Sequence, residues 1–216
     1  MRSYTVTTEK VGLMKANCYI IKSRESDNAV VVDPGGDEMH IKSVLRDMDA
    51  KCVLILLTHG HFDHILGVGG LRSTGCKVAI HSADAHYLTE RDCFSSMIPY
   101  DPRPFEPADF VFESDGIYHA GEFEFSVIHT PGHTPGSVCF AFEDCLFTGD
   151  TLFKNAIGRT DFSDGSPDDM RASLAKLYRM PGDFVVYPGH DERSLLSDER
   201  DRNPFFADVR GRVWEK

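Results

Sequence analysis

The sequence lacks any long hydrophobic segment. Its longest apolar run, Val53–Leu57, is short beside the ~20 apolar residues that a membrane-spanning helix needs. The first ten residues also lack the apolar stretch of a secretory signal peptide. We therefore expect a cytoplasmic protein that has no membrane partner.

Basic residues are few. The chain has 23 Lys and Arg against 34 Asp and Glu, which gives a formal net charge of −11. Because phosphate backbones are bound by basic faces, this balance argues against a nucleic acid partner. A bound metal ion would add local positive charge that the sum does not include.

Closely spaced cysteines are also missing. The chain has six cysteines and no C-x-x-C pair of the kind that holds structural zinc or forms a redox disulfide. In a reducing cytosol, isolated cysteines are usually small buried hydrophobic residues. We therefore predict buried free thiols at all six positions, which are Cys18, Cys52, Cys76, Cys93, Cys139 and Cys145.

What the chain does contain is enough apolar sequence for a substantial core. Of its 216 residues, 41% are hydrophobic and 26% are charged, and this length suits a single domain over residues 1–216. Strand and helix patterns alternate, which favours an α/β fold. Strands are predicted at residues 4–7, 17–22, 29–33, 53–57, 77–80, 116–119, 122–129, 137–142, 145–148 and 184–187.

Two helices have clear signatures. One has its apolar side chains at helical spacing between residues 41 and 48, and the other begins with Ser166 as N-cap and Pro167 in the first turn. The order of elements indicates two similar halves packed together. Residues 92–109 contain four prolines and are predicted to form a loop over the surface.

Histidine is abundant, with ten residues in the chain. The densest cluster is the run His59-x-His61-x-Asp63-His64, which directly follows the apolar strand predicted at residues 53–57. Loops at strand ends are held in place by the sheet, and binding and catalytic residues concentrate there. Imidazole nitrogens and carboxylate oxygens are ligands that suit zinc, iron and manganese.

Three further residues share this setting. His133 and His190 each follow a Pro-Gly pair, and Asp150 closes the run Phe-Thr-Gly-Asp after another predicted strand. The other five histidines share no such context and are interpreted as ordinary surface or core residues: His40, His81, His86, His119 and His129.

These side chains are sufficient for two metal ions. His59 and His61 are two residues apart on extended chain, so both can face one ion, while Asp63 and His64 can face a second. Asp150 is the candidate for a bridging carboxylate. Two ions ~3.5–4 Å apart can share a hydroxide and stabilise a polar transition state.

Taken together, the motifs resemble those of the metallo-β-lactamase superfamily. The matching runs are H-x-H-x-D-H, T-P-G-H-T-P-G-S, F-T-G-D-T-L-F and P-G-H, spread over residues 58–190. The resemblance implies an α/β fold, the αββα four-layer sandwich, with the metal site at one edge of its two mixed sheets. It also implies the ligands, which are His59, His61 and His133 for the first ion, Asp63, His64 and His190 for the second, and Asp150 between them.

Within this superfamily, the chain resembles the hydrolase branch that includes glyoxalase II. Position 150 is Asp, where zinc β-lactamases typically carry Cys, and position 61 is His, where the flavo-diiron branch has Glu. The segments Gly149–Phe153 and Ile157–Phe162 are similar to those of short bacterial glyoxalase-II-like hydrolases.

The same resemblance gives Arg159 a candidate role in substrate binding. Glyoxalase II carries a basic residue there that contacts the glutathione carboxylate, and an arginine can form a bidentate pair with such a group. The alternative is a surface salt bridge. The chain ends 26 residues after His190, so the helical extension of classical glyoxalase II is expected to be absent, which leaves glutathione specificity open.

The resulting hypothesis is a metal-dependent hydrolase that acts on a thioester such as S-lactoylglutathione. We expect zinc as the metal, with iron or manganese as alternatives. The substrate is expected to be a small molecule, and its identity to depend on the loops at 92–109 and 154–166. Asp63 is expected to orient the attacking hydroxide, shared by the two ions, and to accept its proton. The sequence indicates no oligomeric state.

Two other functions fit the same residues. The run Gly158–Phe162 and the segment after His190 also resemble persulfide dioxygenases, which share the fold but use a single iron at the first site. A non-catalytic metal-binding or sensor protein is the non-enzymatic alternative. A complete two-ion set argues against it, because a sensor gains nothing from that arrangement.

Overall fold

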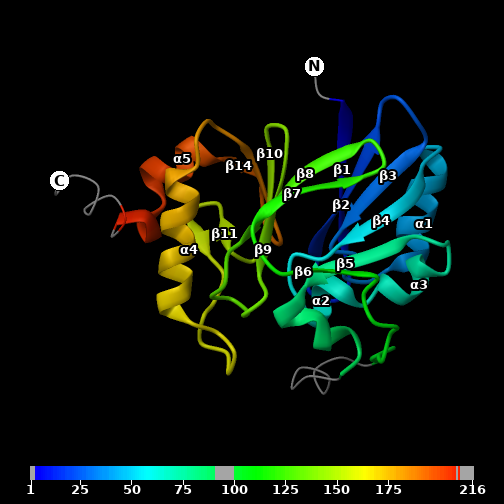
Figure 1. Cartoon of the computed structure of the whole chain (residues 1–216), viewed down its shortest axis with the longest axis horizontal. Coiled ribbons are helices and arrows are strands. Elements are labelled where there is room, and N and C mark those ends of the chain that lie inside the picture. Colours follow the sequence, from blue (N-terminus) through cyan, green and yellow to red (C-terminus); the bar gives the residue numbers. More distant parts are fainter. Residues whose placement is uncertain (1–2, 91–99, 208, 210–216) are drawn as a thin grey trace.

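The computed structural model describes residues 3–90, 100–207 and 209 (Figure 1). Its first half forms a sheet with strand order β1-β2-β3-β4-β5-β6. The pairs β1–β2 and β2–β3 are antiparallel, whereas β3–β4, β4–β5 and β5–β6 are parallel. The strands of this N-terminal sheet are β1 Tyr4–Val11, β2 Ala16–Ser23, β3 Asn28–Val32, β4 Lys51–Leu56, β5 Lys77–His81 and β6 Phe110–Phe112.

The second half forms a sheet of its own, with strand order β14-β13-β10-β9-β8-β7. It is antiparallel except for the parallel pair β10–β13. Its strands are β7 Gly116–Ala120, β8 Phe123–His129, β9 Val138–Phe142, β10 Cys145–Gly149, β13 Val185–Pro188 and β14 Ser194–Leu195. A small hairpin lies apart from this C-terminal sheet and consists of β11 Leu152–Phe153 and β12 Ala156–Ile157.

Helices cover the outer face of each sheet (Figure 1). The N-terminal sheet carries α1 Glu38–Asp47, α2 Phe62–Ile65, α3 Val68–Arg72 and the 3₁₀ segment η1 Ser82–Leu88. The C-terminal sheet carries α4 Pro167–Arg179, α5 Leu196–Arg202 and the 3₁₀ segment η3 Pro204–Phe206. The predicted αββα sandwich of two mixed sheets is therefore confirmed.

The inner faces of the two sheets pack against each other through large side chains. Val30 and Val32 of β3 and Phe140 and Phe147 of the C-terminal sheet are completely buried in this layer. Full burial of one such side chain is worth about 1.5–3 kcal/mol relative to exposure. Aromatic rings cross the interface, as in the edge-to-face contact of Tyr19 with Phe147 at 5.1 Å between centroids. This core fixes the two sheets against each other.

Helix α4 begins as the sequence predicts. The Ser166 hydroxyl accepts a hydrogen bond from the Asp169 backbone nitrogen, and Pro167 occupies the first turn. The buried side of the helix presents Met170, Leu174 and Leu177 to the C-terminal sheet. The apolar spacing of the sequence therefore faces the core, as expected for an amphipathic helix.

The proline-rich segment differs in part from the expected surface loop. Residues 91–99 lie outside the described residues, and the structure shows no regular element at residues 100–109. Within that described part, Arg103 is 1% exposed, and its guanidinium binds the Asp101 carboxylate at 2.7 Å. Phe105 packs against the α1–α3 side of the molecule. An internal ion pair therefore lets this part of the segment turn inward.

The cysteines follow the sequence prediction where they are described. Cys18, Cys52, Cys76, Cys139 and Cys145 are buried free thiols, and Cys93 lies outside the described residues. Across the described ranges, we find no helix that combines the length and the apolarity needed to cross a bilayer.

Candidate metal centre

The seven predicted ligands come from the carboxyl ends of four strands. His59 and His61 follow β4, and Asp63 and His64 lie in the first turns of helix α2 directly after them. The other three follow strands of the second half, namely His133 after β8, Asp150 after β10 and His190 after β13. Because both sheets end these strands at the same edge, residues from the two halves meet there.

The first group is His59, His61 and His133. One nitrogen from each imidazole lies within 4.8 Å of the others, and all three side chains are buried. The His61 Nδ1 and His133 Nε2 atoms are 2.8 Å apart. Three imidazole nitrogens converging at this spacing are the ligand set of many catalytic zinc sites.

The second group is Asp63, His64 and His190, whose ligand atoms are also within 4.8 Å of one another. Asp63 Oδ2 lies 3.2 Å from His190 Nε2 and 3.8 Å from His64 Nε2. Asp150 stands between the groups, with Oδ1 3.4 Å from His64 Nε2 and Oδ2 3.5 Å from His133 Nε2. Asp150 thus lies within 3.5 Å of one imidazole nitrogen from each group.

Asp33 is a residue of the site that the sequence analysis placed only at the end of the strand predicted at residues 29–33. One carboxylate oxygen accepts a hydrogen bond from the Thr58 backbone nitrogen at 2.8 Å. The other accepts from the Thr58 hydroxyl at 2.6 Å and lies 3.0 Å from His64 Nδ1. The Thr58 hydroxyl is in turn 3.1 Å from His59 Nδ1. Asp33 therefore orients His64 directly and His59 through Thr58, which leaves their Nε2 atoms facing the centre.

Other contacts orient His133 and the surrounding loops. The Nδ1 atom of His133 lies 2.8 Å from the carbonyl oxygen of Arg159, so its Nε2 faces Asp150. Asp84, which is completely buried, accepts hydrogen bonds from the backbone nitrogens of Gly60 and Gly136 and from the Thr134 hydroxyl. Asp84 thereby ties the loop after β4 to the loop after β8. The sequence gives no local signal for this role.

Two glycines allow the backbone to approach Asp150 closely. A Cβ at Gly189 would lie 2.2 Å from Asp150 Oδ1, and one at Gly158 would lie 1.8 Å from the Asp150 carbonyl oxygen. Both distances are far below contact distance for carbon and oxygen. The glycine before His190 is therefore required by the packing of the site.

The histidines of the centre differ in the direction of their pKa shifts. Burial lowers the pKa of His59 well below its ordinary value, and the neighbouring imidazoles add to that effect. Burial would also lower the pKa of His64, but Asp63, Asp150 and Asp33 outweigh it and raise that pKa to about 10. Burial would raise the pKa of Asp63, but His64 and His190 bring it well below its usual range. The carboxylates thus favour a positive charge at or next to His64.

The donor set fits divalent metal ions. In the described part of the chain, His59 Nε2, His64 Nε2 and Asp150 Oδ1 are buried atoms that make no hydrogen bond. Leaving such groups without a partner costs about 1–3 kcal/mol each. Coordination of a cation by these nitrogens and oxygens would satisfy them, and N and O ligands of this kind suit zinc, iron and manganese.

A cavity of about 450 Å³ opens onto this centre. Five of the seven predicted ligands line it, namely His61, Asp63, His133, Asp150 and His190. Its remaining wall is largely apolar and consists of Met14, Phe62, Phe153, Ile157, Gly158, Arg159 and Phe162.

Of the two alternatives weighed for Arg159, the structure shows the salt bridge, and the role in substrate binding stays a prediction. Its Nε and Nη2 donate to the Asp161 carboxylate at 2.8 and 2.9 Å, which is the surface salt bridge. Its guanidinium also stacks on the Phe162 ring at 4.2 Å and lines the cavity. The Nη1 atom takes no part in the pair with Asp161, so the residue can still contact a substrate anion.

The wall that contains Phe162 is tied down from the other half of the molecule. The Tyr87 hydroxyl of η1 donates a hydrogen bond to the Asp164 carboxylate. The Phe162 ring lies against His61, with 5.5 Å between centroids. Tyr87 itself packs on the loop of His61, since a Cβ at Gly60 would lie 2.2 Å from its ring. Residues 158–164 are thus held over the first group of ligands.

The remaining histidines stay apart from both ligand groups in the described residues. His40 pairs with Glu9 at 2.8 Å on the surface, and His119 is exposed on β7. His81 and His129 stack on each other with 4.1 Å between ring centroids. A third potential ligand group in the described ranges consists of Asp33, His59 and His64, so none of the three groups includes these histidines or His86.

Comparison with known proteins gives a family match and close structural relatives. A family model described as "Metallo-beta-lactamase superfamily" matches residues 11–190. The protein named hydroxyacylglutathione hydrolase GloC, from Haemophilus influenzae, is 30% identical over 206 residues, which cover 90% of this chain and 94% of GloC.

Two solved structures show the same fold. The crystal structure of the BLEG-1 B3 metallo-beta-lactamase has a TM-score of 0.89 and 34% identity, covering 94% of this chain and all of that one. The structure of TTHA1623 in a di-iron-bound form has a TM-score of 0.80 and 30% identity, covering 92% of this chain and 99% of that one.

Proposed function

The chain belongs to the metallo-beta-lactamase superfamily, and from that premise we propose that it is a binuclear metal-dependent hydrolase acting on thioesters. The observation that carries the proposal is the position of Asp150. Its two oxygens lie 3.4 and 3.5 Å from a nitrogen of each histidine group, so that one carboxylate can serve two ions. We propose His59, His61 and His133 as ligands of the first ion, and Asp63, His64 and His190 as ligands of the second.

The thioester class is supported by a relative and by the cavity. The relative GloC is named a hydroxyacylglutathione hydrolase, and its substrate by that name is a thioester of glutathione. The apolar wall of the cavity suits the acyl and thiol parts of such a compound, and Arg159 offers one cation for a carboxylate. We propose zinc as the first choice of metal, with iron supported by the di-iron form of TTHA1623.

When bound, divalent cations at such a site lower the pKa of water towards neutrality and polarise a substrate carbonyl. The protein residues do the remaining work. Asp63, whose pKa is held low by His64 and His190, is ionised at neutral pH and can accept the proton that the attacking water gives up. The water oxygen bonds to the acyl carbon, the carbon–sulfur bond breaks, and the thiol leaves with a proton. Asp33, Thr58 and the Arg159 carbonyl hold the imidazoles in place throughout.

The proposal is tested by metal analysis and turnover of the purified protein. We expect about two metal ions per chain, which is the stoichiometry of two-metal hydrolases, and hydrolysis of S-lactoylglutathione. His133→Ala should lose both metal and turnover. The matched control is His119→Ala, which removes an exposed imidazole far from the centre and should change neither.

Each of the rival functions gives a different result in the same assays. One iron per chain, together with oxygen uptake on glutathione persulfide, would replace the proposal by the dioxygenase. Hydrolysis of nitrocefin in preference to any thioester would indicate a β-lactamase. Two bound metals without turnover of a thioester, lactone and phosphodiester panel would leave a metal-binding protein. A His133→Ala protein with full metal content would contradict the ligand assignment.

A further inference from the structure

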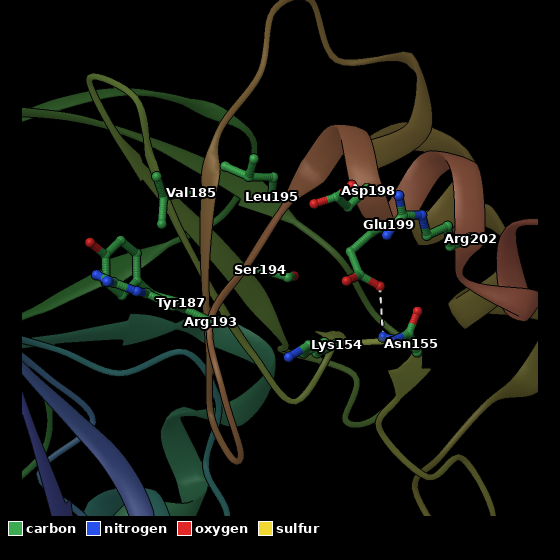
Figure 2. Close-up of a pocket in the computed structure, with 10 residues that line it drawn as sticks. All are labelled: Lys154, Asn155, Val185, Tyr187, Arg193, Ser194, Leu195, Asp198, Glu199 and Arg202. Atoms are coloured by element: carbon green, nitrogen blue, oxygen red, sulfur yellow. Dashed lines mark hydrogen bonds and ion pairs between the residues drawn. The ribbon is translucent and has the colours of Figure 1, made fainter.

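A cavity of about 520 Å³ lies beside helix α5, on the C-terminal half of the molecule (Figure 2). Several of its charged side chains are already engaged within the protein. Lys154 pairs with Glu192 at 2.7 Å. Figure 2 shows the hydrogen bond, 2.8 Å long, that the Asn155 backbone nitrogen donates to the Glu199 carboxylate. We therefore assign no ligand to this cavity.

Two buried cysteines of the N-terminal half, Cys52 and Cys76, lie next to each other. Cys52 is the second residue of β4, and Cys76 directly precedes β5, which pairs with β4 in parallel. Leu54, two residues after Cys52, is the Cα partner of Lys77. Both cysteines belong to the buried layer between the N-terminal sheet and its helices. Their thiols hydrogen-bond to each other, so the two sulfurs are in contact on one face of the sheet.

The backbone spacing at this point suits a disulfide. Neighbouring strands lie about 4.8 Å apart, and a disulfide joins Cα atoms that are about 4.4–6.8 Å apart. Because both side chains face the helix layer, neither strand has to turn over for the sulfurs to be joined. The reduced pair is therefore arranged so that a bond can form between its two members.

Cys76 has the features of a reactive thiol. Its hydrogen bond with Cys52 lowers its pKa to about 7, against the effect of burial, and Thr74 and Arg72 lower it further. By contrast, burial raises the pKa of the Cys139 thiol to about 12. The thiolate is the form of cysteine that reacts, and a large share of Cys76 is in that form at neutral pH.

Cys76 also lies close to the protein surface, although it is only 3% exposed. Residues 73–75, directly before it, are all exposed and form the turn between α3 and β5. A Cβ at Gly75 would meet no other atom within 4 Å, so the turn is open on that side. A small oxidant can therefore reach the Cys76 sulfur with little opening of the turn, whereas a bulky disulfide reagent cannot.

We propose that Cys52 and Cys76 are a redox-active pair that hydrogen peroxide converts to a disulfide. The Cys76 thiolate attacks one peroxide oxygen and the O–O bond breaks, which leaves a sulfenic acid on Cys76. The other oxygen leaves as hydroxide and takes up the proton that Cys76 gave up.

The second step forms the disulfide. The Cys52 sulfur attacks the Cys76 sulfur, the S–O bond breaks, and the departing oxygen takes the Cys52 proton and leaves as water. Together the two thiols lose two electrons, and the peroxide is reduced to two molecules of water. The new bond closes a loop over residues 52–76, which carries four of the seven proposed metal ligands.

The experiment is peptide mapping of the zinc-loaded protein after treatment with hydrogen peroxide, alkylation of the remaining thiols and digestion with trypsin. Zinc is chosen because it has no redox chemistry of its own. Trypsin cuts after Lys51, Arg72 and Lys77, so the two cysteines lie on separate peptides, residues 52–72 and residues 73–77.

We expect these two peptides to be linked, with two fewer free thiols per chain, and dithiothreitol to restore both thiols. Oxidation of one thiol without the link overturns the proposal, as does survival of both thiols. A link between other cysteines in preference to this pair also contradicts it. None of these results depends on thioester turnover, so the test is independent of the proposed function.

Variants assign the two roles. Cys52→Ser keeps a hydrogen-bond donor beside Cys76 but cannot form the link, so a sulfenic acid should accumulate on Cys76 and react with dimedone. Cys76→Ser should slow the oxidation of Cys52 at least about tenfold, because a buried thiol without an attacking partner is inert. An unchanged rate in Cys76→Ser would contradict the role of Cys76.

The matched control is Cys139→Ala, which removes a completely buried cysteine of the other half and should leave the linked peptides unchanged. Thermal melts show whether each variant folds. The mapping of the unaltered chain tests the proposal even where a variant does not fold.

Discussion

The protein contains two clusters of imidazoles that differ in how the neighbouring carboxylates act on them. The metal-centre histidines are His59, His61, His64, His133 and His190, and the paired histidines are His81 and His129. Carboxylates of three aspartates act on His64 and raise its pKa to about 10. Around the paired histidines, burial first and His129 second lower the pKa of His81 to about 4.

The two clusters differ in whether the nearest carboxylate is already bound by other protein groups. Asp150 has an oxygen, Oδ1, that makes no hydrogen bond in the described residues. Asp115, beside the paired histidines, binds the His129 backbone nitrogen at 2.7 Å and the Lys176 ammonium at 3.1 Å. Its charge is therefore neutralised by protein groups. We therefore expect a cation at the first cluster, where Asp150 has an oxygen without a hydrogen bond, and none at the paired histidines.

The largest expected effect is from removing the carboxylate between the two ligand groups. Asp150→Ala should lower metal retention and kcat/KM at least about a hundredfold, because loss of outer-shell partners alone costs 10–100-fold. The measurement is elemental analysis after dialysis, combined with thioester turnover. Asp115→Ala makes the same change beside the paired histidines and should leave metal content unaltered. If both variants retained their metal, the contrast between the two clusters would be wrong.

A smaller effect is expected at Asp33, which orients ligands without being proposed as one. Asp33→Asn keeps the size of the side chain but removes its charge, so His64 and Thr58 lose an acceptor that fixes their orientation. We expect metal affinity to fall about 10–100-fold, measured by competition with a chelator. Thr58→Val is the companion variant and should act in the same direction through His59. Unchanged affinity in both would mean that the imidazoles are oriented by packing alone.

The smallest effect is a pH dependence of stability at the paired histidines. The folded pKa of His81 is about 4, below its ordinary value of 6.5, so between these values the unfolded chain binds a proton that the folded chain does not. Stability is therefore lost as pH falls from 6.5 towards 4. His81→Asn removes this titration and keeps an acceptor for the Ala83 nitrogen that the His81 side chain now binds.

Between pH 7 and pH 4.5, we expect the free energy of unfolding of the variant to fall by about 1 kcal/mol less than that of the wild type. This is below the full value for the shift because His129 is partly exposed and water screens the pair. Urea unfolding of both metal-loaded proteins at several pH values measures the difference. Parallel pH profiles would contradict the assignment, and metal content should be equal in the two proteins.

The sequence predicted the elements well where periodicity was strong. The strands that hold Val30–Val32 and Leu54–Leu56 and the helix that starts after Ser166 are present as expected. Alternation and capping are local properties, so one sequence is sufficient to identify them. The burial of Arg103 was not predicted, because an arginine side chain usually stays in water. Only the structure shows that Asp101 offsets its charge.

The same distinction applies to the site. The run from His59 to His64 can be recognised as a candidate metal site from the sequence alone, since four potential ligands occur within six residues. His133, Asp150 and His190 were identified by shared Gly contexts and by resemblance, and the structure brings them to the same edge. Asp33 and Asp84 carried no comparable signal, because their role depends on hydrogen bonds to residues 24 to 52 positions away.

The amino-acid sequence by itself determined which residue types are available at strand ends and which elements carry them, because propensity and spacing act over a few residues. Only the tertiary structure decided that Asp150 stands between two histidine groups and that Asp115 pairs with Lys176. These outcomes depend on distances between distant segments, and the packing of one sheet on the other sets those distances.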